Sequence, residues 1–154
     1  MNRLLFVLLL LVMAASHGAE RKKYPLDSPQ VVKINERVYA LLGPLELPTR
    51  FNRGYMVNST AIIGDKGVIL IDTGFSDEIG EHLKRAVAKI TPKPVTHVIN
   101  THHHGDHVLG NSAFKGATII SSELCRKLID ETGPGWVEVL EEATEHKFPN
   151  TVPV

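Results

Sequence analysis

The chain has 154 residues, enough for one domain with a hydrophobic core. Its 17 lysines and arginines balance its 17 aspartates and glutamates, so no net field would recruit nucleic acid or an anionic membrane surface. The hydrophobic fraction of 43% argues against disorder, and the single cysteine excludes an internal disulfide or a multi-cysteine zinc site.

The N-terminus has the order of a secretory signal peptide. Arg3 supplies a positive charge, residues 4–13 form an apolar run, and residues 14–19 are small and weakly polar. The run is about half of the roughly 20 residues that a spanning helix needs, although an uncleaved anchor is the alternative. We therefore predict a signal peptide over residues 1–19, a flexible leader over residues 20–30, and an exported protein, periplasmic in a bacterium.

Residues 31–154 are predicted to form one domain that begins with β-strands. Residues 31–42 alternate in polarity and predict a strand pair that turns near Asn35 and Glu36. A proline-containing loop, residues 43–53, follows. Residues 55–63 and 68–71 flank a Gly/Asp-containing turn and predict a hairpin. The second of these runs is apolar on both faces, which places it deep in a sheet.

Helices then alternate with strands. Ser76 can cap a helix that has acidic residues in its first turn and an apolar stripe at Ile79, Leu83, Val87 and Ile90, with His82 on the polar face. The remaining predictions are strands over residues 95–100 and 117–121, a helix over 122–132 that ends at Gly133-Pro134-Gly135, and a helix over 136–146. This order predicts an α/β fold.

Four of the eight histidines lie between positions 102 and 107, directly after the strand over residues 95–100. In an extended loop, residues two apart project to the same side, so His102, His104 and Asp106 can point together while His107 points elsewhere. Two imidazoles suit one zinc ion, and an adjacent carboxylate and imidazole suit a second. His103 falls on the other side. A solvated polar loop, a purification tag or a metal-scavenging tract are alternatives, but none of them requires the preceding strand.

This run resembles a known signature. The stretch Thr101-His-His-His-Gly-Asp-His107 is similar to the HxHxDH motif of the metallo-β-lactamase superfamily, and Asp72-Thr73-Gly74 after an apolar strand resembles that family's Asp-Thr-Gly turn. The resemblance covers residues 31–121. It implies the N-terminal half of an αββα sandwich, with a mixed sheet and flanking helices. Residues 98–111 are also similar to exported branches linked to sulfur oxidation and to quinoprotein systems.

The resemblance implies a role for each matching residue. His102 and His104 would bind one zinc ion, and Asp106 and His107 a second, with Asp106 also orienting the attacking hydroxide. Asp72 would support the ligand loop from beneath, its alternative role being a simple helix-entry turn. Iron or manganese could replace zinc at such a site.

The same resemblance implies a zinc-dependent hydrolase in which metal-bound hydroxide attacks a carbonyl-type small molecule: a β-lactam, a thioester, a lactone or a sulfur compound. The family's remaining ligands have no match here, because His146 is the only histidine after His107 and its neighbours differ from the family pattern. We therefore expect the domain to be incomplete at its C-terminus and the 154-residue chain alone to be inactive. The alternative is a truncated, non-catalytic metal-binding or interaction module. We expect no nucleic-acid partner and no stable membrane span after signal cleavage, and nothing in the sequence indicates an oligomeric state.

Overall fold

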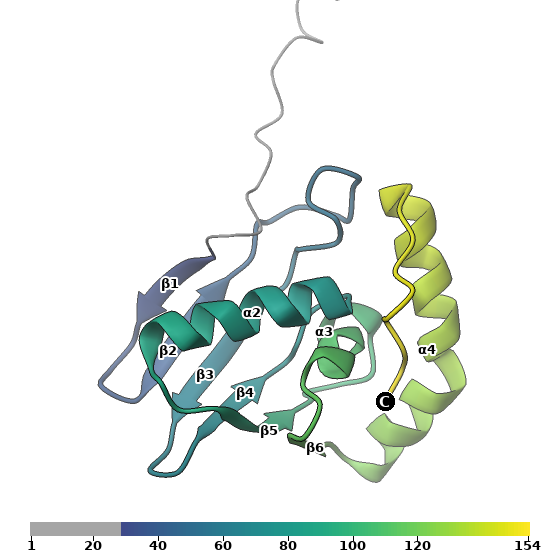
Figure 1. The fold of residues 1–154 in the computed structure, drawn as a ribbon. Helices are drawn as coiled ribbons and strands as arrows, with labels where there is room; N and C mark the ends of the chain where they lie inside the picture. Colours follow the sequence, from purple (N-terminus) through teal and green to yellow (C-terminus); the bar gives the residue numbers. More distant parts are fainter. Residues whose placement is uncertain (1–28) are drawn as a thin grey trace, which may run out of the picture.

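A computed structural model describes residues 29–154 (Figure 1). The predicted signal peptide and most of the predicted leader lie outside the described residues, and the leader's last residue, Gln30, opens the first strand. The elements are β1 Gln30–Lys33, β2 Val38–Leu42, β3 Ser59–Ile63, β4 Val68–Ile71, α2 Asp77–Ile90, β5 Val95–Ile99, α3 Gly105–Val108, the 3-10 helix η1 Leu109–Ala113, β6 Thr118–Ile120 and α4 Glu123–Thr144. Among the described helices, none has the length and apolar character needed to cross a membrane.

The six strands form one mixed sheet in the order β1-β2-β3-β4-β5-β6. The first four strands pair antiparallel, whereas β4 with β5 and β5 with β6 pair parallel. The predicted hairpin is confirmed: β3 and β4 meet at Ile63 and Val68, and the Gly64 N–H donates to the Gly67 carbonyl at 2.8 Å. The predicted turn at Asn35 is confirmed too, since its side-chain oxygen accepts from the N–H groups of Arg37 and Val38. The expected α/β fold with a mixed sheet and flanking helices is therefore confirmed.

Helix α2 connects β4 to β5 and lies across one face of the sheet (Figure 1). The Ser76 side chain caps it by accepting from the Ile79 N–H at 3.2 Å, as predicted. The predicted stripe packs on the sheet, with Ile79, Leu83 and Val87 buried against Val68, Leu70 and Val98. This layer of helix on sheet is the main core of the described residues.

The prediction that His82 lies on the polar face of α2 is wrong. Its side chain is 1% exposed, and its ring meets the ring of Tyr55 edge-on with centroids 5.0 Å apart. Position 82 is three residues from Ile79 and four from Ala86, so on a helix it borders the buried stripe. Tyr55 comes from the loop before β3 and is buried in the same core as Ile79 and Ala86.

The predicted break between two C-terminal helices is also wrong, because α4 runs unbroken through Pro134. Proline removes one N–H from the helix interior, here the donor to the carbonyl of residue 130, but Asp130 is exposed and water can serve that carbonyl. Packing holds the helix on both sides of the proline. Cys125 and Ile129 pack on Val108, and Leu140 packs in a second cluster with Phe75, Leu109 and Phe148. Cys125 is thus a small, buried core residue.

Candidate metal centre

The candidate site lies where two neighbouring parallel strands end. Ile71 of β4 is paired with Ile99 of β5, and the Asp72 N–H continues the ladder by donating to the Ile99 carbonyl at 3.0 Å. The chain after β4 enters the turn at Asp72, and the chain after β5 enters the histidine run. Functional groups gather at the carboxyl ends of parallel strands because both connections leave the sheet at the same edge.

Asp72 is buried beneath this edge and is held in an uncommon conformation. Its φ of 58° lies in the left-handed region, which non-glycine residues seldom adopt. Its carboxylate accepts the Thr101 N–H at 2.9 Å and the Thr101 hydroxyl at 2.8 Å, and its Oδ2 lies 2.8 Å from His107 Nδ1. Burial alone would raise the pKa of Asp72, but the hydrogen bonds from His107 and Thr101 outweigh it and hold that pKa below its usual value. Asp72 is therefore an ionised acceptor beneath the loop.

The histidine run does not stay extended. His104 has extended backbone angles and is the N-cap of the one-turn helix α3, so Asp106 and His107 lie on a helical turn. The argument from residues two apart, which assumed an extended loop, therefore does not describe this run, because residues 101–103 form bends and Asp106 and His107 lie on a helical turn. Even so, the side chains gather: the His102 ring centroid lies 4.8 Å from that of His104 and 4.1 Å from that of His107, and His107 Nε2 lies 3.5 Å from Asp106 Oδ2.

His103 stands further out, its ring centroid 6.5 Å from that of His102, although it also touches His104 at 4.9 Å. Within residues 29–154, no set of three or more histidine, cysteine, aspartate or glutamate side chains is arranged to hold one metal ion. The role of His102, His104, Asp106 and His107 as metal ligands stays a prediction.

The donor set itself fits zinc or a similar divalent ion. If Asp72 accepts the proton on His107 Nδ1, then Nε2 of His107 carries a lone pair that faces the Asp106 carboxylate. A cation between these two atoms would satisfy both. Burial lowers the pKa of His107, but the hydrogen bond to Asp72 and the charges of Asp106 and Asp72 raise it overall, so the environment favours positive charge here. For His102, burial and the neighbouring His107 and His104 lower the pKa, which favours the neutral imidazole that binds metals.

Hydrogen bonds join the two turns that carry these groups. The Thr73 N–H donates to the His107 carbonyl at 2.8 Å, and the side chains of Asn100 and Asn111 exchange hydrogen bonds of 3.1 and 2.9 Å. Gly110 fits directly against the Thr73 backbone, since a Cβ there would lie 2.0 Å from the Thr73 carbonyl oxygen. Sequence reasoning did not assign roles to Asn100 and Asn111. The sequence signal that could have found this pair is a polar residue directly after a strand, Asn100, and a second polar residue within a mostly apolar segment, Asn111.

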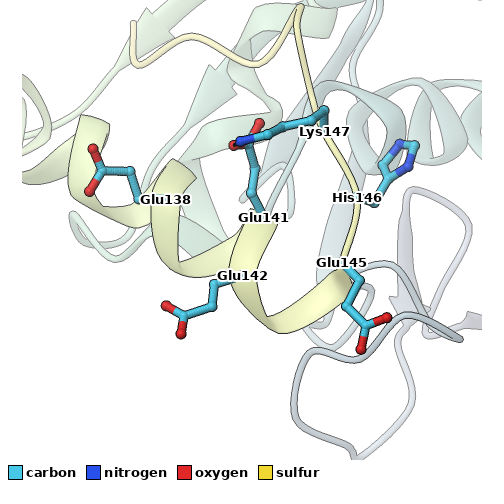
Figure 2. A pocket seen from close by; sticks show the side chains of 6 residues that line it. All are labelled: Glu138, Glu141, Glu142, Glu145, His146 and Lys147. Carbon is cyan, nitrogen blue, oxygen red and sulfur yellow. Dashed lines mark hydrogen bonds and ion pairs between the residues drawn. The ribbon is translucent and has the colours of Figure 1, made fainter.

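His146 lies away from this cluster. Its Nε2 is 3.2 Å from Glu78 Oε1 and in contact with the Arg53 guanidinium, which itself pairs with Glu78 at 2.8 Å. Figure 2 shows it at the end of α4, beside an open pocket lined by Glu138, Glu141, Glu142, Glu145, His146 and Lys147. No residue of the 102–107 run lines that pocket, and His146 contacts both members of the Arg53–Glu78 ion pair.

Residues 52–153 match the family model described as the metallo-beta-lactamase superfamily. The chain belongs to this superfamily. Among curated members, it is 32% identical over 100 residues to a metallo-beta-lactamase type 2 of Bacillus sp. (strain 170), a match that covers 61% of this chain and 38% of that protein. It is 33% identical over 67 residues to a linear primary-alkylsulfatase of Pseudomonas sp. (strain ATCC 19151), covering 44% of this chain and 13% of the other.

The fold of this superfamily member resembles solved structures over part of their length. The metallo-beta-lactamase FIM-1 from Pseudomonas aeruginosa, in a mono-zinc form, superposes with a TM-score of 0.57 at 20% identity, covering 71% of this chain and 49% of that one. A metallo-beta-lactamase from Pontibacter korlensis superposes with the same TM-score at 24% identity, covering 69% and 49%. The chain therefore spans about half the length of these structures and less of the curated relatives.

Proposed function

We propose that residues 72–107 form the ligand-bearing part of a zinc-dependent hydrolase centre. His102 and His104 would bind one metal ion, and Asp106 and His107 a second, with iron or manganese as alternatives to zinc. The observation that carries the proposal is the contact of the buried Asp72 carboxylate with His107 Nδ1 at 2.8 Å, because it presents Nε2 beside Asp106. A superfamily of hydrolases matched across this region supports it.

When bound, zinc lowers the pKa of water and polarises a carbonyl oxygen. The residues of the chain supply position and proton control. Asp72 would keep His107 in the tautomer with Nε2 free, and the half-buried Asp106 carboxylate would orient the nucleophile. Since catalytic zinc ordinarily takes three protein ligands, a complete centre needs donors in addition to the two pairs on this run.

The substrate would be a small molecule with an electrophilic centre: a β-lactam, a thioester, a lactone or a sulfur compound. Relatives named as metallo-beta-lactamases support the first, and a relative named as an alkylsulfatase supports sulfur chemistry. An exported, periplasmic location would suit both a β-lactam and a sulfur compound. Membership of an exported branch linked to sulfur oxidation or to quinoproteins would be consistent with that location. The balanced charge disfavours nucleic acid.

Metal counting after equilibrium dialysis tests the proposal. We expect the 154-residue chain to retain zinc, His104→Ala to retain less, and the control His97→Ala to match the wild type, because His97 is exposed on β5 and outside the run. Equal zinc in His104→Ala and the wild type would contradict the proposed ligands. Chromogenic β-lactam and thioester assays should show no turnover by this chain alone. Chelator-sensitive turnover would mean that residues 29–154 already complete the centre.

A further inference from the structure

The single tryptophan of the chain, Trp136 on α4, lies against the histidine run. Its ring centroid is 5.4 Å from that of His104, with the two planes at 55°. It also lies over Gly105, where an added Cβ would come within 2.6 Å of the Trp136 Cβ and 2.9 Å of its Cγ. The indole is thus a neighbour of both the His104 ring and the backbone that follows it.

His104 differs from the two other histidines proposed as ligands in what orients its ring. His107 is held by Asp72, and the His102 Nδ1 lies 3.0 Å from the Thr101 hydroxyl. Among the described residues, the His104 imidazole has no hydrogen-bond partner, and its side chain is exposed. Its ring lies against three others, those of His102, His103 and Trp136. Of these, Trp136 alone comes from another element of the fold.

Packing holds the Trp136 ring in a fixed position. Its ring meets the Phe75 ring edge-on at 6.5 Å, and Phe75 belongs to the buried cluster with Leu140 and Phe148. Its indole N–H is buried and has no acceptor among the described residues. Such burial costs folding free energy, so packing and not hydrogen bonding keeps the ring in place. Ligand imidazoles ordinarily need a partner that fixes the ring plane, and packing against a rigid indole can do this for His104.

We propose that Trp136 is a positioning residue that fixes the His104 imidazole for metal binding. The proposal rests on the proposed metal centre. Without the Trp136 ring, the exposed His104 side chain would sample other rotamers. Metal binding would then be weaker, because it would have to restrict His104 to one rotamer. By analogy with other groups that orient metal ligands, we expect metal affinity to fall roughly tenfold.

The test uses the 154-residue chain and cobalt(II), whose visible absorption reports coordination in every variant. Trp136→Leu removes the ring, Trp136→Phe keeps an aromatic ring, and Val139→Ala changes an exposed residue one turn further along α4. We expect roughly tenfold weaker cobalt binding with an altered visible spectrum for Trp136→Leu, most of the affinity restored in Trp136→Phe, and no change in Val139→Ala. In the wild type, tryptophan fluorescence should be quenched with the same midpoint as the visible absorption.

A second measurement needs no metal. Three-bond couplings at the His104 Cβ protons should show one χ1 rotamer in the wild type and averaging in Trp136→Leu. If the wild type binds cobalt but Trp136→Leu binds it equally well with unchanged couplings, the positioning role is overturned while the metal centre stands. If the wild type binds no cobalt, both are overturned. Should Trp136→Leu fail to fold by circular dichroism, wild-type binding without fluorescence quenching would overturn the role of Trp136.

Discussion

Replacing Asp72 by asparagine removes one charge and almost no volume, and asparagine also tolerates the left-handed backbone that Asp72 adopts. The Oδ1 position can still accept the Thr101 N–H. The amide NH2 that replaces Oδ2 cannot accept from the Thr101 hydroxyl or from His107 Nδ1, so two of the three hydrogen bonds are lost. Hydrogen bonds to a charged group contribute about 1.5–3 kcal/mol each, and partial rearrangement should leave a loss of about 2 kcal/mol in the free energy of unfolding.

The consequence for the metal site should exceed the consequence for stability. The asparagine NH2 can donate to His107 Nδ1, which places the imidazole proton on Nε2 and blocks the nitrogen that faces Asp106. We expect zinc affinity at the Asp106 and His107 pair to fall by 10–100-fold. Asp65→Asn is the matched control, because its carboxylate is 86% exposed and, within residues 29–154, its one ion pair is with Arg37.

Three measurements check the Asp72 prediction. Urea unfolding gives the stability change, nitrogen-15 shifts of the His107 ring report its tautomer, and isothermal titration with zinc gives the affinity. The reasoning is refuted if Asp72→Asn folds, keeps the proton of His107 on Nδ1 and binds zinc as tightly as Asp65→Asn does. A stability loss with unchanged zinc affinity would show that Asp72 supports the turn without directing the ligand.

Three further predictions concern the packing and the N-terminus. Gly110→Ala should lower the free energy of unfolding by roughly 1–3 kcal/mol, because its Cβ would collide with the rigid Thr73 carbonyl. The control Gly135→Ala, in open space on α4, should raise the free energy of unfolding by up to about 1 kcal/mol. Urea unfolding measures both changes. Burial raises the pKa of Tyr55 to about 12, so the stability it contributes is complete below its unfolded pKa of about 10 and is lost as pH rises towards 12. Tyr55→Phe should lack this alkaline loss of about 2–3 kcal/mol in thermal melts, and equal slopes would contradict it. Mass spectrometry of exported protein should find a new N-terminus between Ala15 and Arg21, and soluble protein that keeps Met1 would rule out the signal peptide.

Elements that are specified by residues close to them in the sequence could be predicted from the sequence. The Ser76 cap and the stripe at Ile79, Leu83 and Val87 predicted α2, and the turn at residues 64–67 predicted the β3–β4 hairpin. The two groups of site residues were predictable as well, since Asp72 and the 102–107 run each follow an apolar strand. Parallel pairing of those strands brings the two together, which the resemblance to the superfamily had implied.

Only the tertiary structure decided features that depend on residues distant in sequence. A proline flanked by glycines predicts a break, yet α4 continues through it. Gly133 packs on Pro153, and buried residues hold the helix on both sides, Ile129 before the proline and Leu140 after it. His82 has a polar side chain, and the folded structure shows that it is buried, with its ring against that of the loop residue Tyr55. The contact of Trp136 with His104 joins residues 32 positions apart, and neither has a local pattern that points to the other. Local pattern records what the backbone prefers, whereas burial and contact depend on which surfaces meet when the chain folds.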